Sequence, residues 1–289
     1  MRQMEADEES ERRRGEEGRP EGRTIRVFHS LGKTGGTVVS RCLGCMEKVA
    51  LLSEIHPQGP AMFAPLFADQ PELSRKWDPL VQAREWFDWF DDEGAGSAGE
   101  MGFSEAIGRI EAQAAAHGKE LVIRDWSHPD FIGAPFRDRP TGESETVKAL
   151  AGGFRILRAA IVRHPVDHWL SKRKLPWMRE RLTLERFMEG YLAFAKLCRG
   201  IPTIRFEDFT KVPQASVWFL CEALELSYDA DFIGKWWEFD KLTGDLNSER
   251  GGSVIGPRPR RAHEEELIDA FREIDGYRES LALLGYEDE

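Results

Sequence analysis

The chain has 289 residues, of which 41% are hydrophobic and 31% are charged, as in globular proteins. Its 51 acidic residues outnumber its 40 basic ones, giving a net charge of −11, so we expect no binding to nucleic acid or to an anionic membrane surface. Four cysteines are too few for a disulfide scaffold. With no membrane-spanning run and no secretory leader, the sequence predicts a cytoplasmic protein.

The chain divides into a charged tail and one folded domain. Residues 1–23 are mostly charged, Gly or Pro and contain no aromatic or β-branched residue, which predicts a disordered tail. From Thr24 onward, short apolar runs alternate with helical patterns. Residues 24–289 are therefore expected to form a single α/β domain, with a mostly parallel sheet between two helical layers.

The expected elements follow from periodicity and from cap residues. Strands are predicted at 24–29, 49–53, 121–123, 154–162 and 203–206. Helices are predicted at 38–46, 104–117, 184–198, 214–224 and 263–284. Residues 57–100 carry several prolines and are expected to be irregular.

A glycine-rich turn joins the first strand to the first helix. It reads Gly32-Lys33-Thr34-Gly35-Gly36-Thr37. Backbone N–H groups at a helix N-terminus attract anions, Lys33 adds a positive charge, and two glycines permit close approach of the backbone. Thr34 and Thr37 add hydroxyl donors. The pattern predicts a P-loop-type phosphate-binding loop, although the Walker A motif is incomplete because Val27 stands where its first glycine should be.

A second candidate anion site follows the fourth strand. Arg163 comes directly after that strand, at the edge of the sheet where α/β proteins bind ligands. Ser171 lies eight residues later, about two helical turns away. A guanidinium and a hydroxyl placed in this way can share one phosphate group.

Together these segments resemble the sulfotransferases that use 3′-phosphoadenosine 5′-phosphosulfate (PAPS). Gly32–Thr37 resembles their 5′-phosphosulfate loop, and Arg163 with Ser171 resembles their 3′-phosphate motif. The stretch Arg205 to Phe209, followed by Pro213, resembles a later strand of the family that ends in Glu-Asp. Gly251-Gly252-Ser253 with Arg258, Arg260 and Arg261 resembles the C-terminal basic motif of the cytosolic members only loosely.

The resemblance implies a donor site and an activity. Lys33 would stabilise charge on the leaving phosphate, and Gly32, Thr34, Gly35, Gly36 and Thr37 would hold the 5′-phosphosulfate. Arg163 and Ser171 would hold the 3′-phosphate, Phe206 would lie near the adenine, and Arg258 would help to bind the nucleotide. PAPS would be the donor co-substrate, no metal would be needed, and the acceptor would be a hydroxyl or amine of a small molecule or glycan.

Three residues are candidates for the general base that an acceptor hydroxyl requires. Glu54, in Ser53-Glu54-Ile55-His56, resembles the catalytic Glu of glycan-type sulfotransferases, and His56 lies two residues further on. His128 follows the third strand, as does the catalytic His of the phenol and steroid enzymes. All three stay open at this point, with Glu54 preferred over His128.

Two other functions are consistent with the same loop. A P-loop kinase or NTPase would need a magnesium-binding Asp, for which Asp125 and Asp208 are weak candidates. A non-catalytic nucleotide-binding module would retain the loop without turnover. Cys42 and Cys45 form a CxxC pair, but with no second pair nearby we predict buried thiols rather than a metal site.

Overall fold

The computed structural model describes residues 23–90, 101–244 and 252–288. The predicted tail, residues 1–23, lies almost entirely outside these ranges. Within them, no helix combines the length and the apolar content needed to cross a bilayer.

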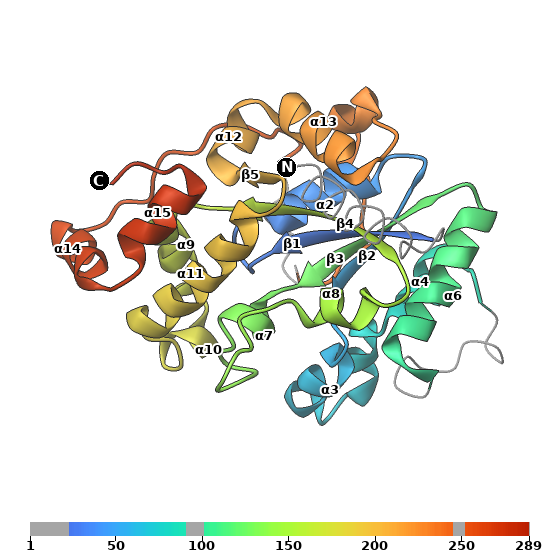
Figure 1. Ribbon diagram of the computed structural model, residues 1–289, viewed down its shortest axis with the longest axis horizontal. Helices are drawn as coiled ribbons and strands as arrows, with labels where there is room; N and C mark the ends of the chain where they lie inside the picture. The colour runs from blue at the N-terminus through green and yellow to red at the C-terminus, as the bar shows by residue number, and fades with distance from the viewer. Residues whose placement is uncertain (1–22, 91–100, 245–251, 289) are drawn as a thin grey trace, which may run out of the picture.

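A five-stranded sheet forms the centre of the molecule (Figure 1). Its strands are β1 (Thr24–Ser30), β2 (Val49–Ile55), β3 (Glu120–Trp126), β4 (Arg155–Val162) and β5 (Thr203–Arg205). They lie in the order β2-β3-β1-β4-β5, and every pair is parallel. The predicted three-layer α/β fold is therefore confirmed, with a described sheet that is wholly parallel.

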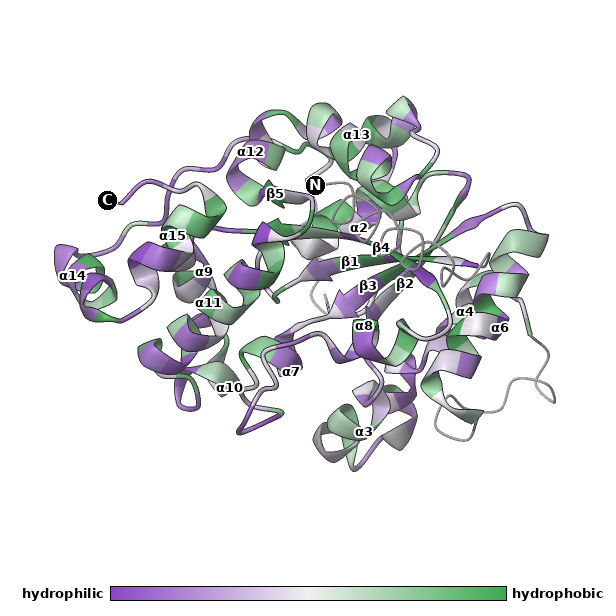
Figure 2. Cartoon of the chain, in the orientation of Figure 1, coloured by the Kyte–Doolittle hydropathy of each residue, from purple (hydrophilic) through white to green (hydrophobic). Residues whose placement is uncertain are grey.

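Helices cover both faces of the sheet (Figure 1). One face packs against α2 (Gly36–Gly44), α12 (Phe206–Lys211) and α13 (Pro213–Leu224). The other packs against α4 (Pro79–Phe87), α6 (Phe103–Ala116), α8 (Glu145–Leu150), α9 (Pro165–Lys172), α11 (Leu184–Arg199) and α15 (Tyr277–Leu284). Strands β1 to β4 contribute apolar residues to both faces, and Figure 2 shows hydrophobic residues along the strands and the inner helix surfaces.

The strand register brings the candidate site residues to one edge. Ser30, the last residue of β1, is opposite Trp126 of β3 and Ile161 of β4. Since these neighbouring strands are parallel, the segments that follow them leave the sheet at the same edge. The phosphate loop, His128 and Arg163 thus start from neighbouring positions, although up to 130 residues separate them in the chain.

Two predicted segments differ from the structure. The predicted irregular segment 57–100 lies within the described residues only up to residue 90. This part is not simply irregular: it includes α3 (Gly59–Phe63), η1 (Ala64–Phe67), η2 (Pro71–Trp77) and α4. The Asp78 carboxylate accepts from the N–H of Leu80 and caps α4, with Pro79 at the first helical position.

The predicted helix 263–284 is two helices, α14 (Glu265–Glu273) and α15. Gly276 separates them with a φ of 89°, which a continuous right-handed helix cannot include. The remaining elements are α7 (His128–Phe131), α10 (Pro176–Arg179), η3 (Ala230–Gly234) and η4 (Trp236–Glu238).

Candidate active site

The glycine-rich loop turns sharply between β1 and α2. Lys33 and Gly35 both have left-handed backbone conformations, with φ of 78° and 100°. A Cβ atom at Gly35 would overlap the Phe206 ring, and one at Gly36 would overlap Ser30 Oγ. These two positions therefore require glycine, and the first N–H groups of α2 face outward from the turn.

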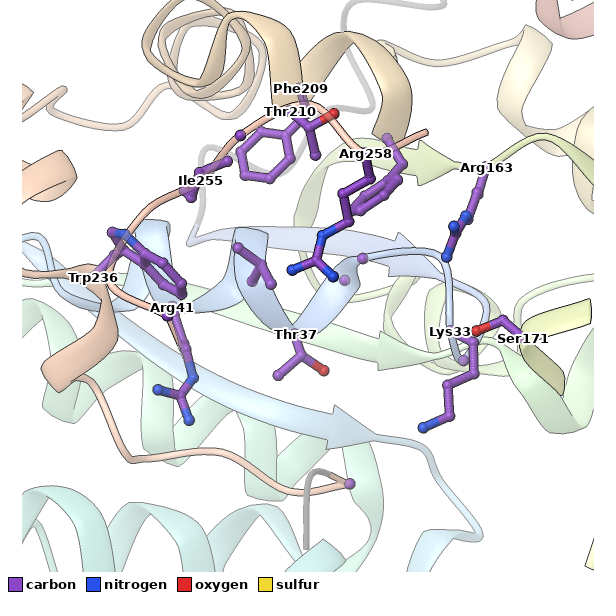
Figure 3. Close-up of a pocket in the computed structure, with 18 of the residues that line it drawn as sticks. Lys33, Thr37, Arg41, Arg163, Ser171, Phe209, Thr210, Trp236, Ile255 and Arg258 are labelled. Carbon is purple, nitrogen blue, oxygen red and sulfur yellow. The ribbon is translucent and has the colours of Figure 1, made fainter. Parts of the chain in front are cut away.

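A cavity of about 260 Å³ opens over the loop (Figure 3). In Figure 3, Lys33, Arg163 and Ser171 lie at one end, and Arg41 and Trp236 lie at the other. Of the predicted donor-site residues, all but Thr34 line it: Gly32, Lys33, Gly35, Gly36, Thr37, Arg163, Ser171, Phe206 and Arg258. Thr34 is fully buried and its hydroxyl donates to the Leu31 carbonyl at 2.7 Å, so this side chain stabilises the turn instead of facing the cavity.

A cationic cluster forms the second candidate anion site. Arg163 is only 9% exposed, and its guanidinium lies 4.8 Å from the centre of the Phe206 ring. Arg261 Nη2 lies 3.4 Å from Ser171 Oγ, which joins the C-terminal segment to α9. The buried Nε atoms of Arg163 and Arg261 have no hydrogen-bond partner among the described residues. Burial lowers the pKa of Arg163 below its ordinary value, with nearby Asp167 opposing the shift.

The segment after residue 252 crosses the cavity and is fixed by Asp167. Asp167 accepts from the Arg261 N–H at 2.8 Å and forms an ion pair with Arg260. Arg258 reaches between the two ends of the cavity (Figure 3). Arg261 is not among the donor-site residues predicted from the sequence, although it belongs to the C-terminal basic motif with Arg258 and Arg260.

Glu54 lies at the boundary of the cavity in a strained conformation. Its φ is 54°, at a bulge where the register of β2 against β3 shifts. Left-handed backbone at a non-glycine residue costs about 1–3 kcal/mol and is concentrated at functional sites. The carboxylate lies 3.3 Å from Arg124 Nη2 and accepts from Trp77 Nε1 at 3.4 Å. A Cβ atom at Gly244 would overlap it, so this residue must be small.

Arg124 was missed because it looks like part of an apolar strand. It lies in β3, lines the cavity, and its Nη2 also donates to Thr37 Oγ1 at 3.2 Å. It thus connects the phosphate loop to Glu54. An arginine directly after the apolar run Leu121-Val122-Ile123, at the end of a buried strand, is the signal that could have identified it.

The two histidine candidates are less accessible than Glu54. His56 is fully buried, lies outside the residues that line the cavity, and its Nε2 is 3.0 Å from Asp130. His128 is 3% exposed, and its Nε2 donates to the Ala134 carbonyl at 2.6 Å while its Nδ1 lies 2.9 Å from Lys172 Nζ. Burial, and then the charge of Lys172, lower the pKa of His128 well below 6.5.

One cluster of potential metal ligands exists among the described residues, namely His56, Asp130 and Glu145. Arg137 donates to both carboxylate oxygens of Glu145, at 2.7 and 2.8 Å, and lies 3.4 Å from Asp130. This guanidinium already balances the carboxylates, and it is the first cause of the lowered pKa of Glu145. The cluster therefore has the character of a buried ion-pair network.

No protein-family model matches the sequence, and no curated protein matches it. Solved structures do resemble it. The sulfotransferase domain of the Synechococcus PCC 7002 olefin synthase superposes with a TM-score of 0.55 at 15% identity, covering 93% of this chain and 98% of that one.

Two further structures align less closely. A sulfotransferase from Alicyclobacillus acidocaldarius gives a TM-score of 0.46 at 14% identity, over 92% of this chain and 97% of the other. Retinol dehydratase in complex with androsterone and the inactive cofactor PAP gives a TM-score of 0.38 at 12% identity, over 89% of this chain and 80% of the other. Scores below 0.5 do not establish a shared fold. On the first match, together with the parallel sheet and its glycine-rich loop, the chain has the fold of a sulfotransferase.

Proposed function

We propose that the protein transfers a sulfuryl group from PAPS to a hydroxyl or amine of an acceptor. The observation that carries this proposal is the presence of two anion sites in one cavity. The glycine-rich loop with Lys33 is one, and Arg163, Ser171 and Arg261 form the other. A donor with phosphate groups on both its 5′ and its 3′ positions would occupy both.

The residues present fit such a donor. Gly35 and Gly36 pack so closely against Phe206 and Ser30 that no Cβ atom fits at either residue. This tight turn presents the N-terminus of α2 to the cavity, where an anion would bind. Arg163 and Arg261 both line the cavity, and their guanidinium groups would donate charge-assisted hydrogen bonds to a 3′-phosphate. Elsewhere in the same cavity, Phe206, Phe209, Trp236 and Ile255 supply an apolar lining suited to an adenine ring.

Each group in the site then has a physical role. When bound, PAPS would supply an activated sulfuryl group whose departure leaves charge on the 5′-phosphate. Lys33 and the backbone N–H groups of α2 are placed to stabilise that charge, and they need no reorganisation because the loop is already formed. Glu54 would accept the proton of the acceptor hydroxyl, with its carboxylate oriented by Arg124 and Trp77.

Glu54 is favoured over His128 because it lines the cavity. Both ring nitrogens of His128 are occupied by Ala134 and Lys172, and its lowered pKa makes it a weaker base. His56 is engaged by Asp130 in the ion-pair network. We therefore assign the base to Glu54.

The acceptor side favours a molecule with an apolar surface. Trp77, which donates to Glu54, stacks on Phe63 with ring centroids 3.6 Å apart. Phe63 in turn stacks on Trp126 at 4.4 Å. These three rings are buried, and the partly buried Met62, Phe67 and Phe136 pack against them. An acceptor that approaches Glu54 from this side would meet apolar side chains, so we propose a small-molecule alcohol or amine rather than a highly charged glycan.

A kinase or NTPase is less well supported. Each candidate Asp has one carboxylate oxygen engaged by neighbouring side chains: Asp125 Oδ2 bonds to His29 and Ser127, and Asp208 Oδ2 bonds to Arg205. Neither Asp lines the cavity. A non-catalytic nucleotide-binding module would not need the strained Glu54 beside the loop.

Calorimetric titration tests the proposal. Adenosine 3′,5′-bisphosphate (PAP) should bind more tightly than ADP or ATP, and magnesium should not improve ATP binding. Turnover of PAPS in the presence of an aromatic alcohol would then be measured as release of PAP. Tighter binding of ATP, enhanced by magnesium, would refute the proposal and favour the kinase; PAP binding without turnover over a broad acceptor screen would favour the non-catalytic module.

A further inference from the structure

A buried lysine lies directly behind the phosphate loop. Lys172, the last residue of α9, is 3% exposed and does not line the cavity, although its neighbour Ser171 does. Its Nζ is 3.3 Å from the position that a Cβ atom on Gly32 would take, so the ammonium lies against the loop backbone. On its other side, Lys172 Nζ lies 2.9 Å from His128 Nδ1.

The groups that face Lys172 leave its charge poorly balanced. His128 donates through Nε2 to Ala134, so its Nδ1 must accept from Lys172 and the ring is neutral. His168, on the same helix, donates to the Gly32 carbonyl at 2.8 Å, and its pKa is lowered well below 6.5 by burial and by Lys172. Lys33 lies on the loop and repels Lys172, whereas Glu54 on β2 attracts it. Arg186 adds further positive charge beside His128.

These surroundings change the protonation of Lys172. Burial first, and then the charge of Lys33, lower its pKa from 10.5 to about 7, with Glu54 opposing the shift. Near neutral pH, the side chain is therefore protonated in only part of the molecules. An anion in the loop would favour the protonated form, because opposite charges attract strongly where water is excluded.

We propose that Lys172 takes up a proton from solvent when the anionic donor occupies the phosphate loop, and so becomes a second cation, behind Lys33, for the charge that develops on the 5′-phosphate. This proposal rests on the proposed function. Lys172 acts through the loop and does not touch the cavity, so it is a positioning residue. The only chemical change is Lys172–NH₂ plus H⁺ giving Lys172–NH₃⁺, with the proton supplied by the buffer.

Proton uptake on PAP binding tests this inference. Titration calorimetry in buffers of different ionisation enthalpy gives the number of protons taken up. With a free pKa of about 7, Lys172 should take up about 0.9 proton at pH 8, about 0.5 at pH 7 and about 0.1 at pH 6. At pH 8 the phosphates of PAP, whose second pKa is about 6, are already ionised and contribute little.

Two variants assign the uptake to this side chain. Lys172→Met should abolish proton uptake at pH 8 and weaken PAP binding about tenfold. Lys174→Met, two residues further on at an exposed position, should retain both. A lysine that serves only to hold His128 would be protonated throughout, and its replacement would not alter the count of protons.

The outcomes separate this inference from the proposed function. PAP binding by the wild type without proton uptake at pH 8 would overturn the role of Lys172 and leave the donor site intact. Absence of PAP binding would overturn both. If Lys172→Met does not fold, proton uptake is measured on Lys172→Gln instead. The pH series of the wild type then shows whether Lys172 takes up the proton. Uptake that rises between pH 6 and 8 supports Lys172, because His128 and His168 have pKa values too low to give that profile.

Discussion

Replacing Arg163 by methionine should separate binding from stability. If Arg163 holds the 3′-phosphate, the variant loses a guanidinium that can donate two charge-assisted hydrogen bonds to that group. Each such bond contributes about 1.5–3 kcal/mol, and the total is smaller than the sum because Arg261 and Ser171 remain. We expect a loss of about 3 kcal/mol, or roughly 100-fold in PAP affinity.

The same substitution should not destabilise the protein: the free energy of unfolding should stay the same or rise. Burial depresses the pKa of Arg163, which means that the folded state disfavours its charge relative to the unfolded chain. Methionine occupies a similar volume and can still pack against Phe206. The melting temperature of Arg163→Met should therefore be unchanged or higher, although PAP binds more weakly.

The assay compares two ligands and two variants. PAP and adenosine 5′-monophosphate differ by the 3′-phosphate, so Arg163→Met should weaken PAP alone and bring its affinity close to that of the monophosphate. Arg173→Met, an exposed arginine just after α9, should change neither. An equal loss for both ligands, or a fall in melting temperature that parallels the loss of binding, would refute the assignment of Arg163 to the 3′-phosphate.

Three further substitutions test other parts of the structure. Glu54→Gln should lower turnover by about 10²- to 10⁴-fold with unchanged PAP affinity. If His128→Gln lowers turnover by more than Glu54→Gln does, the general base is His128. Gly36→Ala should weaken PAP binding at least tenfold because its Cβ would overlap Ser30, whereas Gly256→Ala, which lines the same cavity with open space around it, should bind normally in the same titration. Gly276→Ala should lower the free energy of unfolding by about 1–3 kcal/mol and the melting temperature by several degrees, because it places a side chain at a φ of 89° and against Leu192. An unchanged melting temperature would mean that the junction of α14 and α15 tolerates another conformation.

The donor half of the site could be predicted because its signals are local. The glycine-rich loop follows β1 directly, and Arg163 and Ser171 are eight residues apart across a single strand–helix junction. In a parallel sheet the carboxyl ends of all strands lie at one edge, so the topology alone brings such junctions together. Periodicity alone was sufficient for all five strands, whose predicted centres agree with the structure.

The rest depended on contacts that no local pattern specifies. Arg261 meets Ser171 across 90 residues, and Thr243, beside Gly244, meets Ser53 across 190, both from segments without regular structure. The segment 57–100 was predicted to be irregular because it carries several prolines, and its described helices are too short to show a clear helical period. The Glu54 backbone is left-handed because of a bulge in β2, which sequence periodicity does not reveal.

The net charge of the chain does not describe the field in the cavity. The whole protein carries −11, yet a single carboxylate, that of Glu54, occurs among the described residues that line the cavity. The same lining carries six cations: Lys33, Arg41, Arg124, Arg163, Arg258 and Arg261. Surface charges more than a Debye length away, about 8 Å in physiological salt, are largely screened, whereas charges in a partly enclosed cavity are not. An acidic protein can therefore exclude polymers that need a broad basic surface and still bind a small nucleotide with two phosphate groups here. The one lining carboxylate is the group to which we assign the proton transfer.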